Sequence, residues 1–317
     1  MMSWETVSAI FLFLLGLGLI IKGGDVFVDA ATWMAEASGI PKFIVGATIV
    51  SIATTLPEVF ASSIAAAGGS TEIAVGNAVG SVTANTGLIM GVSVIFLPMV
   101  IRRAQIGLKS GMMLTSILAL LLVCLDGEVT LLDSVLLFAL FVAFIIENVY
   151  SASRNKEKEE RPQVTKKILL INLLKFVLGA AALAIGSNLL VDNGKYLAKL
   201  IGVPERIIAI TLIAIGTSLP ELVTAITSLV KKQGSMSVGN IIGANIIDIT
   251  MILPICSFIS GGTLTVPTAS VRLDMPVCLA IAAIALLPTL IFKKFHRVQG
   301  VIMVGGYIAY LIYSVLA

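Results

Sequence analysis

The stretch "GIPKFIVGATIVSIATTLPE", residues 39–58, has a near copy in "GVPERIIAITLIAIGTSLPE", residues 202–221. Nine of the twenty positions are identical at an offset of 163 residues. Each copy ends in Leu-Pro-Glu, which places a helix-breaking residue and a carboxylate at the end of an apolar run. This pair of segments indicates that the chain arose by internal duplication.

Two further pairs of segments align at the same offset without a gap. They are "VGNAVGSVTANTG" at 75–87 with "VGNIIGANIIDIT" at 238–250, and "DVFVDAA" at 25–31 with "NLLVDNG" at 188–194. Chance similarity between two apolar segments does not easily repeat Pro, Glu and Asn at one fixed spacing. The duplication therefore extends over both halves of the chain.

The composition is that of a membrane protein. The chain has 317 residues, of which 58% are hydrophobic and 12% charged, whereas soluble domains carry about 25% charged residues. A helix that spans a bilayer needs about 20 apolar residues, and backbone groups in lipid must be satisfied within helices or a closed barrel. The runs are too long and continuous for barrel strands, so we predict an all-α polytopic membrane protein with ten transmembrane helices. The predicted spans are 6–24, 40–67, 73–99, 108–125, 130–150, 167–187, 204–230, 236–259, 271–292 and 298–316.

The charged segment "SASRNKEKEERPQVTKK", residues 151–167, divides the chain at its midpoint and is predicted to be a cytoplasmic linker. Residues 1–150 then form the first five-helix repeat and residues 168–317 the second. Because five is an odd number, the second repeat enters the membrane upside down. Inverted repeats with helices broken at matching places, here the second helix of each repeat, are typical of transporters whose substrate site lies at the repeat interface.

The distribution of Lys and Arg predicts the orientation. With the N-terminus outside, most basic residues fall in inside connections, and the positive-inside rule then makes both termini extracellular in the plasma membrane. The net charge of +3 comes from residues scattered over these connections, so nucleic acid is not an expected partner. The first apolar run lacks a basic region and a cleavage site before or after it, so we expect it to be retained. The residues counted inside are Lys22, Lys42, Arg102, Arg103, Lys109, the basic residues of 151–167, Lys231, Lys232, Lys293, Lys294 and Arg297, and those outside are Lys195, Lys199, Arg206 and Arg272.

The second helix of each repeat carries the expected chemistry. Pro57 and Pro220 each lack an N–H and clash with the carbonyl four residues back, so they kink the helices and free carbonyls near Ala53 and Gly216. Hydroxyls and a carboxylate adjoin each kink, and spacings of three and four residues place them on one helical face. These residues are Thr54, Thr55 and Glu58 in one half, and Thr217, Ser218 and Glu221 in the other. A freed carbonyl in hydrocarbon is costly unless a cation or water uses it.

The third helix of each repeat adds a second polar face, with Ser81 and Asn85 in one half and Ala244 and Asp248 in the other. A charged side chain at mid-bilayer costs at least ~2.5–3.5 kcal/mol, and Lys175 is the one basic residue expected within the membrane. We therefore interpret the carboxylates as a cation site; protonated carboxyls that hold helices together are the structural alternative. Carboxylate, amide, hydroxyl and carbonyl oxygens suit Ca²⁺, and the lack of His and Cys argues against zinc or copper.

Three other acidic residues, Asp25, Asp29 and Asp192, follow the first predicted helix of each repeat. We interpret them as interfacial caps.

At this point the motifs resemble a known family. "TTLPE" with "GNAVGSVTAN", and "GTSLPE" with "GNIIGANIID", look like the paired alpha-repeats of the sodium/calcium exchanger branch of the cation/calcium antiporter superfamily, over essentially the whole chain. The resemblance implies a secondary-active antiporter, without cofactor, that extrudes Ca²⁺ in exchange for Na⁺ by alternating access. It implies a Ca²⁺ site at Glu58 and Glu221 with carbonyls near Thr54 and Thr217, flanked by Asn85 and Asp248. The implied Na⁺ ligands are Ser51, Thr54, Thr55, Glu58, Ser81, Ala214, Thr217, Ser218 and Glu221.

One departure from the family pattern concerns the counter-ion. Ala244 stands where the family usually has a serine, which removes the hydroxyl that would match Ser81. Relatives that exchange protons for Ca²⁺ share the fold and both glutamates, so an H⁺/Ca²⁺ antiporter is the alternative. A cation channel would give no reason for inverted repeats. An enzyme would need a nucleophile–base pair or metal-binding histidines, which the sequence does not offer.

Overall fold

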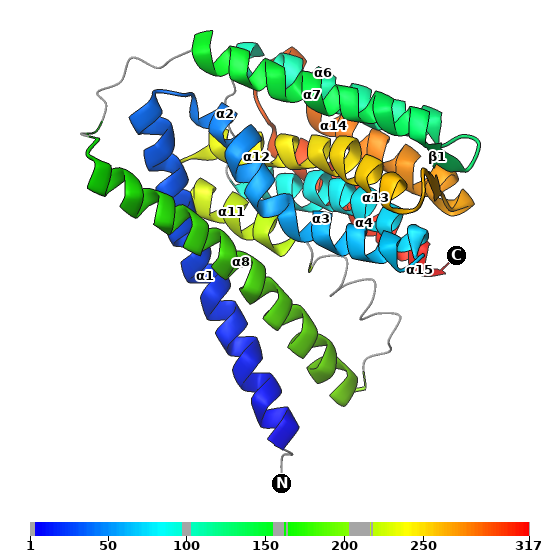
Figure 1. The fold of residues 1–317 in the computed structure, drawn as a ribbon, viewed down its shortest axis with the longest axis horizontal. Coiled ribbons are helices and arrows are strands. Elements are labelled where there is room, and N and C mark those ends of the chain that lie inside the picture. The colour runs from blue at the N-terminus through cyan, green and yellow to red at the C-terminus, as the bar shows by residue number, and fades with distance from the viewer. Residues whose placement is uncertain are drawn as a thin grey trace.

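The computed structural model describes residues 4–96, 103–154, 162, 164–202, 216 and 218–316, and almost all of them are helical (Figure 1). The first half contains α1 (Trp4–Ser38), α2 (Lys42–Val45), the π-helical turn η1 (Gly46–Val50), α3 (Ser51–Ala67), α4 (Thr71–Ala84), the π-helical turn η2 (Asn85–Met90), α5 (Gly91–Phe96), α6 (Arg103–Val123), strand β1 (Glu128–Thr130) and α7 (Leu131–Arg154). The second half contains α8 (Lys166–Leu200), α11 (Leu219–Val230), α12 (Gly234–Ile247), the π-helical turn η4 (Asp248–Ile252), α13 (Leu253–Ile259), strand β2 (Thr263–Thr265), the π-helical turn η5 (Ser270–Asp274), α14 (Met275–Phe292) and α15 (Arg297–Leu316).

Eight helical segments among the described residues are long and apolar enough to cross a membrane. The shorter apolar helix α11 accounts for the end of the predicted span 204–230, whose residues 204–215 lie outside the described part of the chain. The prediction of a helical membrane protein is thus confirmed.

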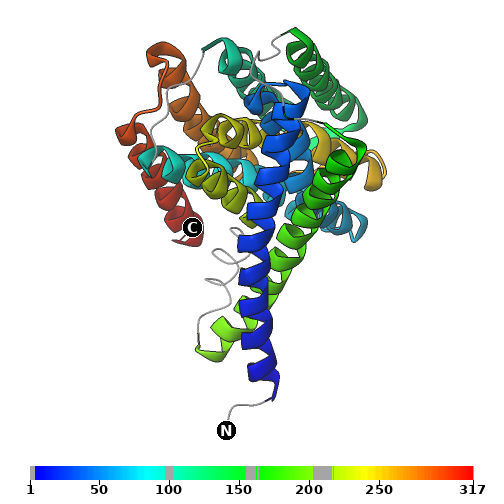
Figure 2. The ribbon, with the colours of Figure 1, turned by 90° about the vertical axis from the view of Figure 1, so that its left-hand side faces the viewer.

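Helices α1 and α8 form a crossed pair that extends away from the remaining bundle (Figures 1 and 2). Glycines bring the two backbones together: a Cβ atom added to Gly16 would lie 2.8 Å from the carbonyl oxygen of Gly186, and one added to Gly23 would lie 3.1 Å from that of Gly179. Close backbone approach at small residues is the usual basis of helix association in membranes. The two helices therefore pack as one unit.

The duplication is visible in the backbone. The turns η2 and η4 begin at Asn85 and Asp248, which are related by the 163-residue offset. Wide π-helical turns of this kind are frequently found at functional sites. The polar residues that begin them are therefore candidates for the site.

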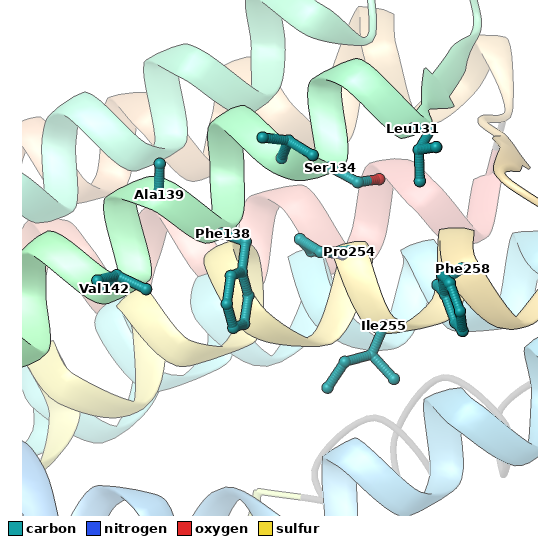
Figure 3. Close-up of a pocket in the computed structure, with 9 residues that line it drawn as sticks. Leu131, Ser134, Phe138, Ala139, Val142, Pro254, Ile255 and Phe258 are labelled. Atoms are coloured by element: carbon teal, nitrogen blue, oxygen red, sulfur yellow. The ribbon is translucent and has the colours of Figure 1, made fainter.

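A short two-stranded antiparallel sheet departs from the all-helical expectation. Strand β1 pairs with β2, with Val129 opposite Leu264, and the Ser257 hydroxyl donates to the Val129 carbonyl at 3.1 Å. Near this sheet, α7 and α13 border an apolar groove of about 550 Å³, which Phe138 of α7 and Pro254 and Phe258 of α13 line (Figure 3). The groove contains none of the predicted cation ligands.

The interpretation of the interfacial acids as helix caps was wrong. Helix α1 continues to Ser38, so Asp25 and Asp29 lie inside it, and both bind Lys231, with Nζ–Oδ1 distances of 2.9 and 2.7 Å. Asp192 lies inside α8, with its Oδ1 3.5 Å from Lys195 Nζ. Asp25 and Asp29 therefore pair with a residue far along the chain, whereas Asp192 pairs within its own helix.

Lys109 was assigned from the sequence to an inside connection, but it lies within α6 with a nearly fully buried side chain. It forms an ion pair with Glu147 of α7. Lys175, by contrast, is exposed on α8. Lys109 is thus a buried basic residue within the predicted span 108–125, and its partner is not one of the carboxylates assigned to the cation site.

Candidate cation-binding site

Glu58 lies on α3 directly after Pro57. The helix continues through the proline without a gap, and the π-helical turn η1 directly precedes it. The Glu58 side chain is 1% exposed, and neither carboxylate oxygen has a hydrogen-bond partner among the described residues. A buried carboxylate without a partner is costly, which a bound cation would offset.

Glu221 occupies the matching place in the second half. Helix α11 begins at Leu219, so Pro220 lies in its first turn, where its missing N–H costs least. Glu221 is also 1% exposed; its Oε1 accepts a long hydrogen bond of 3.5 Å from Thr55, and its Oε2 has no partner in the described part of the chain. The Thr55 contact places residues of both repeats at one site, and Glu58 lies within electrostatic range of Glu221 and Asp248.

A hydrogen-bond chain joins three helices beside the two glutamates. The Thr54 hydroxyl donates to Asn240 Oδ1 at 3.3 Å, and Asn240 Nδ2 donates to the Thr224 hydroxyl at 3.1 Å. The Thr224 hydroxyl in turn donates to the Pro220 carbonyl at 2.8 Å. Asn240 and Thr224 thus link α3 to α11 through α12, a role that the sequence did not assign to them. Only Asn240 carried a signal, because Asn77 stands at its matching position in the first half.

The third helices bring the other predicted residues into the buried interior. The side chains of Ser81, Asn85 and Asp248 are each 2% exposed or less, and each has at least one polar atom without a partner among the described residues. Ala244 is fully buried on α12, directly before the turn η4 that Asp248 begins. Helix α12 approaches α3 closely, because a Cβ atom added to Gly243 would lie 2.6 Å from Ser51 Oγ.

Of the four remaining predicted ligands, two are described by the structure and two are not. Ser51 is buried and donates to the Thr48 carbonyl at 3.0 Å, and Ser218 is buried with an unpaired hydroxyl, as far as the described residues go. Ala214 and Thr217 lie outside the described residues. Residues 4–96, 103–154, 164–202 and 218–316 hold no group of three or more His, Cys, Asp or Glu side chains close enough to bind one metal ion, so Glu58, Glu221 and Asp248 do not form such a group.

The sequence predicts that Pro220 frees the Gly216 carbonyl for a cation or water, but in the structure a side chain binds this carbonyl. The Gly216 carbonyl accepts a hydrogen bond of 2.7 Å from the Ser187 hydroxyl of α8. This contact links the crossed pair α1/α8 to the residues just before α11.

The geometry defines a class of protein. Two buried carboxylates, one from each of two related halves, meet hydroxyl and amide oxygens inside a bundle of membrane-spanning helices. Oxygen donors with negative charge are the ligands of hard cations. An inverted-repeat membrane transporter for cations has this construction.

The comparison with protein families names the class. The family model for sodium/calcium exchanger proteins matches residues 8–149 and 171–316. The chain therefore belongs to the sodium/calcium exchanger protein family.

Individual relatives cover nearly the whole chain. The sodium/calcium exchanger MaX1 of Methanosarcina acetivorans is 30% identical over 94% of this chain and 96% of its own length. The inner membrane protein YrbG of Escherichia coli is 32% identical over 95% of this chain and 94% of its own. A solved structure of the sodium-calcium exchanger NCX_Mj, soaked with Na⁺ and Ca²⁺, matches with a TM-score of 0.84 at 28% identity, over 96% of this chain and 98% of that one. The predicted fold, ten transmembrane helices in two inverted repeats, is confirmed.

Proposed function

We propose that this protein is a secondary-active antiporter that moves Ca²⁺ out of the cell in exchange for Na⁺. The observation that carries the proposal is the pair of buried carboxylates without full hydrogen bonding, Glu58 and Glu221, on matching helices of the two repeats. The names of the relatives, sodium/calcium exchanger MaX1 and sodium-calcium exchanger NCX_Mj, support it.

In this proposal Glu58 and Glu221 bind Ca²⁺ together with backbone carbonyls near Thr54 and Thr217. Asn85 and Asp248 flank the centre, and Pro57 and Pro220 provide the kinks. The proposed Na⁺ ligands are Ser51, Thr54, Thr55, Glu58, Ser81, Ala214, Thr217, Ser218 and Glu221.

Exchange follows from competition for the same oxygens. Two ionised glutamates balance the charge of one Ca²⁺, whereas several Na⁺ ions can share the same ligands. Because both kinds of ion need Glu58 and Glu221, they cannot occupy the site together. Alternating access of the shared site to the two sides then couples the Na⁺ gradient to Ca²⁺ movement.

A second candidate counter-ion is H⁺. Ala244 is fully buried and provides no hydroxyl at the position that matches Ser81, so the second half lacks the counterpart of that expected Na⁺ ligand. In a proton-coupled exchanger, Glu58 and Glu221 would bind protons in place of Na⁺.

The deciding experiment is ⁴⁵Ca²⁺ uptake into proteoliposomes that contain the purified full-length protein. We expect uptake when Na⁺ is high inside and low outside, and none without that gradient. Uptake that requires a pH gradient at constant Na⁺ would identify H⁺ rather than Na⁺ as the counter-ion. No uptake under either gradient would refute antiport.

We further propose a plasma-membrane location with both termini outside, from the excess of Lys and Arg in the inside connections. Single cysteines placed near each terminus, in a background where Cys124, Cys256 and Cys278 are replaced by Ala, would test it. We expect both to react with a membrane-impermeant maleimide in intact cells. Protection of either terminus until the cells are opened would contradict the orientation.

A further inference from the structure

Ser187 is a polar link between the crossed pair α1/α8 and the ligand-bearing helix of the second repeat. Its side chain is buried, 4% exposed, on α8, and its hydroxyl donates to the Gly216 carbonyl at 2.7 Å. The two residues are 29 positions apart, so the hydrogen bond is a tertiary contact.

The carbonyl of Gly216 lies three residues before α11, and Pro220 prevents that helix from extending back to include it. In a regular helix the N–H of residue 220 would donate to this carbonyl, and proline has no N–H. A buried carbonyl without a donor costs about 1–3 kcal/mol. The Ser187 hydroxyl replaces the missing backbone donor. The ion ligands proposed at Ser218 and Glu221 follow within five residues of the tied carbonyl.

The first repeat has no equivalent tie from the position that matches Ser187. That position is Gly24 on α1, which has no side chain, and an added Cβ there would lie 2.7 Å from Val223 Cγ1. On the side of α3, residues Ala53 and Pro57 instead border a groove of about 630 Å³ that α8 closes with small residues such as Ala180 and Ala184. The hydrogen bond therefore distinguishes the second break from the first.

We propose that Ser187 is a positioning residue for cation binding: it holds the Gly216 carbonyl and thereby sets the geometry of the Ser218–Glu221 ligand segment according to the position of α8. The proposal rests on the proposed function, because it concerns the same cation site. Because α8 packs against α1 through glycines, the two helices move together, and any displacement of the pair changes the geometry of this hydrogen bond directly.

The test combines Ser187→Ala with Pro220→Ala in a double-mutant cycle. We expect Ser187→Ala to raise the apparent KM for Ca²⁺ about three- to tenfold, the effect of one buried hydrogen bond, with a smaller change in turnover. Pro220→Ala restores an N–H at residue 220, so in that background the hydroxyl becomes redundant and Ser187→Ala should change the KM by less than about twofold. Two sites that act independently would instead give additive effects.

Asn193→Ala is the matched control. Asn193 also lies on α8, and its side chain donates to the Leu189 carbonyl of the same helix at 2.7 Å, so its loss removes a hydrogen bond that does not reach the second break. We expect a wild-type KM for this variant. Ca²⁺-induced thermal stabilisation of the purified variants is measured in parallel, so that cation affinity is obtained even where transport is slow.

The outcomes separate the two proposals. A wild-type protein that is stabilised by Ca²⁺ but shows no gradient-driven uptake refutes the exchange function and leaves the affinity test of Ser187 in force. Wild-type exchange with an unchanged Ca²⁺ affinity in Ser187→Ala overturns the positioning role. An equal loss of affinity from Ser187→Ala in the wild-type and Pro220→Ala backgrounds also overturns it, because the hydroxyl would then act on something other than the Gly216 carbonyl.

Discussion

The two repeats contain the same carboxylates but differ in how they are tied to the crossed pair α1/α8. Glu58 and Glu221 occupy matching positions, and both are buried with at least one unpaired oxygen as far as the described residues go. The second repeat is linked to α8 by Ser187 and to α1 by Lys231, which follows α11. The residues at the matching positions, Gly24 and Gly68, have no side chains. The duplication thus preserved the two buried carboxylates and changed the polar contacts around them.

This difference separates two kinds of constraint. In the proposed function a ligand is needed in both halves, because Glu58 and Glu221 bind the cation together. In the proposal for Ser187, a tie to the crossed pair is needed where the position of α8 sets the geometry of the ligand segment. If this distinction holds, changing either glutamate should have similar, large effects, whereas changing the contacts that differ between the repeats should have smaller ones.

The largest effects are expected at the shared carboxylates. Glu58→Gln and Glu221→Gln each remove a buried charge that the cation requires, and we expect each to lower Na⁺-driven ⁴⁵Ca²⁺ uptake by at least ~100-fold. Glu72→Gln, at the exposed start of α4, makes the same chemical change away from the site and should leave uptake unchanged. Normal exchange in either site variant would exclude that glutamate as a ligand.

A smaller loss is expected at the central position where the halves differ. Asp248 begins η4 as Asn85 begins η2, so the fold already accommodates asparagine at this place. We expect Asp248→Asn to retain folding and to lower exchange by about tenfold or less, clearly less than the glutamate variants. The initial rate of ⁴⁵Ca²⁺ uptake measures the difference. A loss as complete as that of Glu221→Gln would make Asp248 a ligand of equal weight.

Much of this arrangement could be predicted from the sequence, because the duplication fixes equivalent positions. The 163-residue offset paired Asn85 with Asp248, and a π-helical turn begins at each of them. The motif around Pro57 and Pro220 identified the two buried glutamates. What failed depends on contacts between distant residues. Asp25 and Asp29 resemble the end of a helix until Lys231 is placed beside them, and Lys109 resembles a loop residue until Glu147 is placed beside it. Hydropathy along the chain contains no information about such partners.

Ala244→Ser should produce a moderate effect of opposite direction. The change restores a hydroxyl on α12 at the position that matches Ser81, whose own hydroxyl is buried and unpaired among the described residues. If Na⁺ is the counter-ion, one added ligand should raise the apparent Na⁺ affinity about three- to tenfold. The Na⁺ dependence of ⁴⁵Ca²⁺ efflux gives this affinity, and Ala244→Cys, which adds similar volume with a poor oxygen mimic, is the control. An unchanged Na⁺ dependence would remove position 244 from the Na⁺ site.

The smallest effect is expected at the second tie, Lys231→Gln. The ammonium group binds Asp25 and Asp29 of α1 but is about a quarter exposed, so its loss should cost about 1 kcal/mol or less. Thermal unfolding in detergent should show a decrease of about 1–3 °C. Lys232→Gln, the exposed neighbour, makes the same charge change and should show no decrease.

The pH dependence of this tie has a definite sign. Burial alone would lower the pKa of Lys231, but its hydrogen bonds and charge interactions with Asp29 and Asp25 outweigh burial and raise it. A raised pKa means that the contribution is fully present below the unfolded value of about 10.4 and is lost as the pH rises through the folded value. The difference in Tm between wild type and Lys231→Gln should therefore stay constant from about pH 6 to pH 9 and shrink only above about pH 10.5. A difference that disappears near neutral pH would mean that Lys231 does not bind the two aspartates as a cation, and the asymmetry between the repeats would then rest on Ser187 alone.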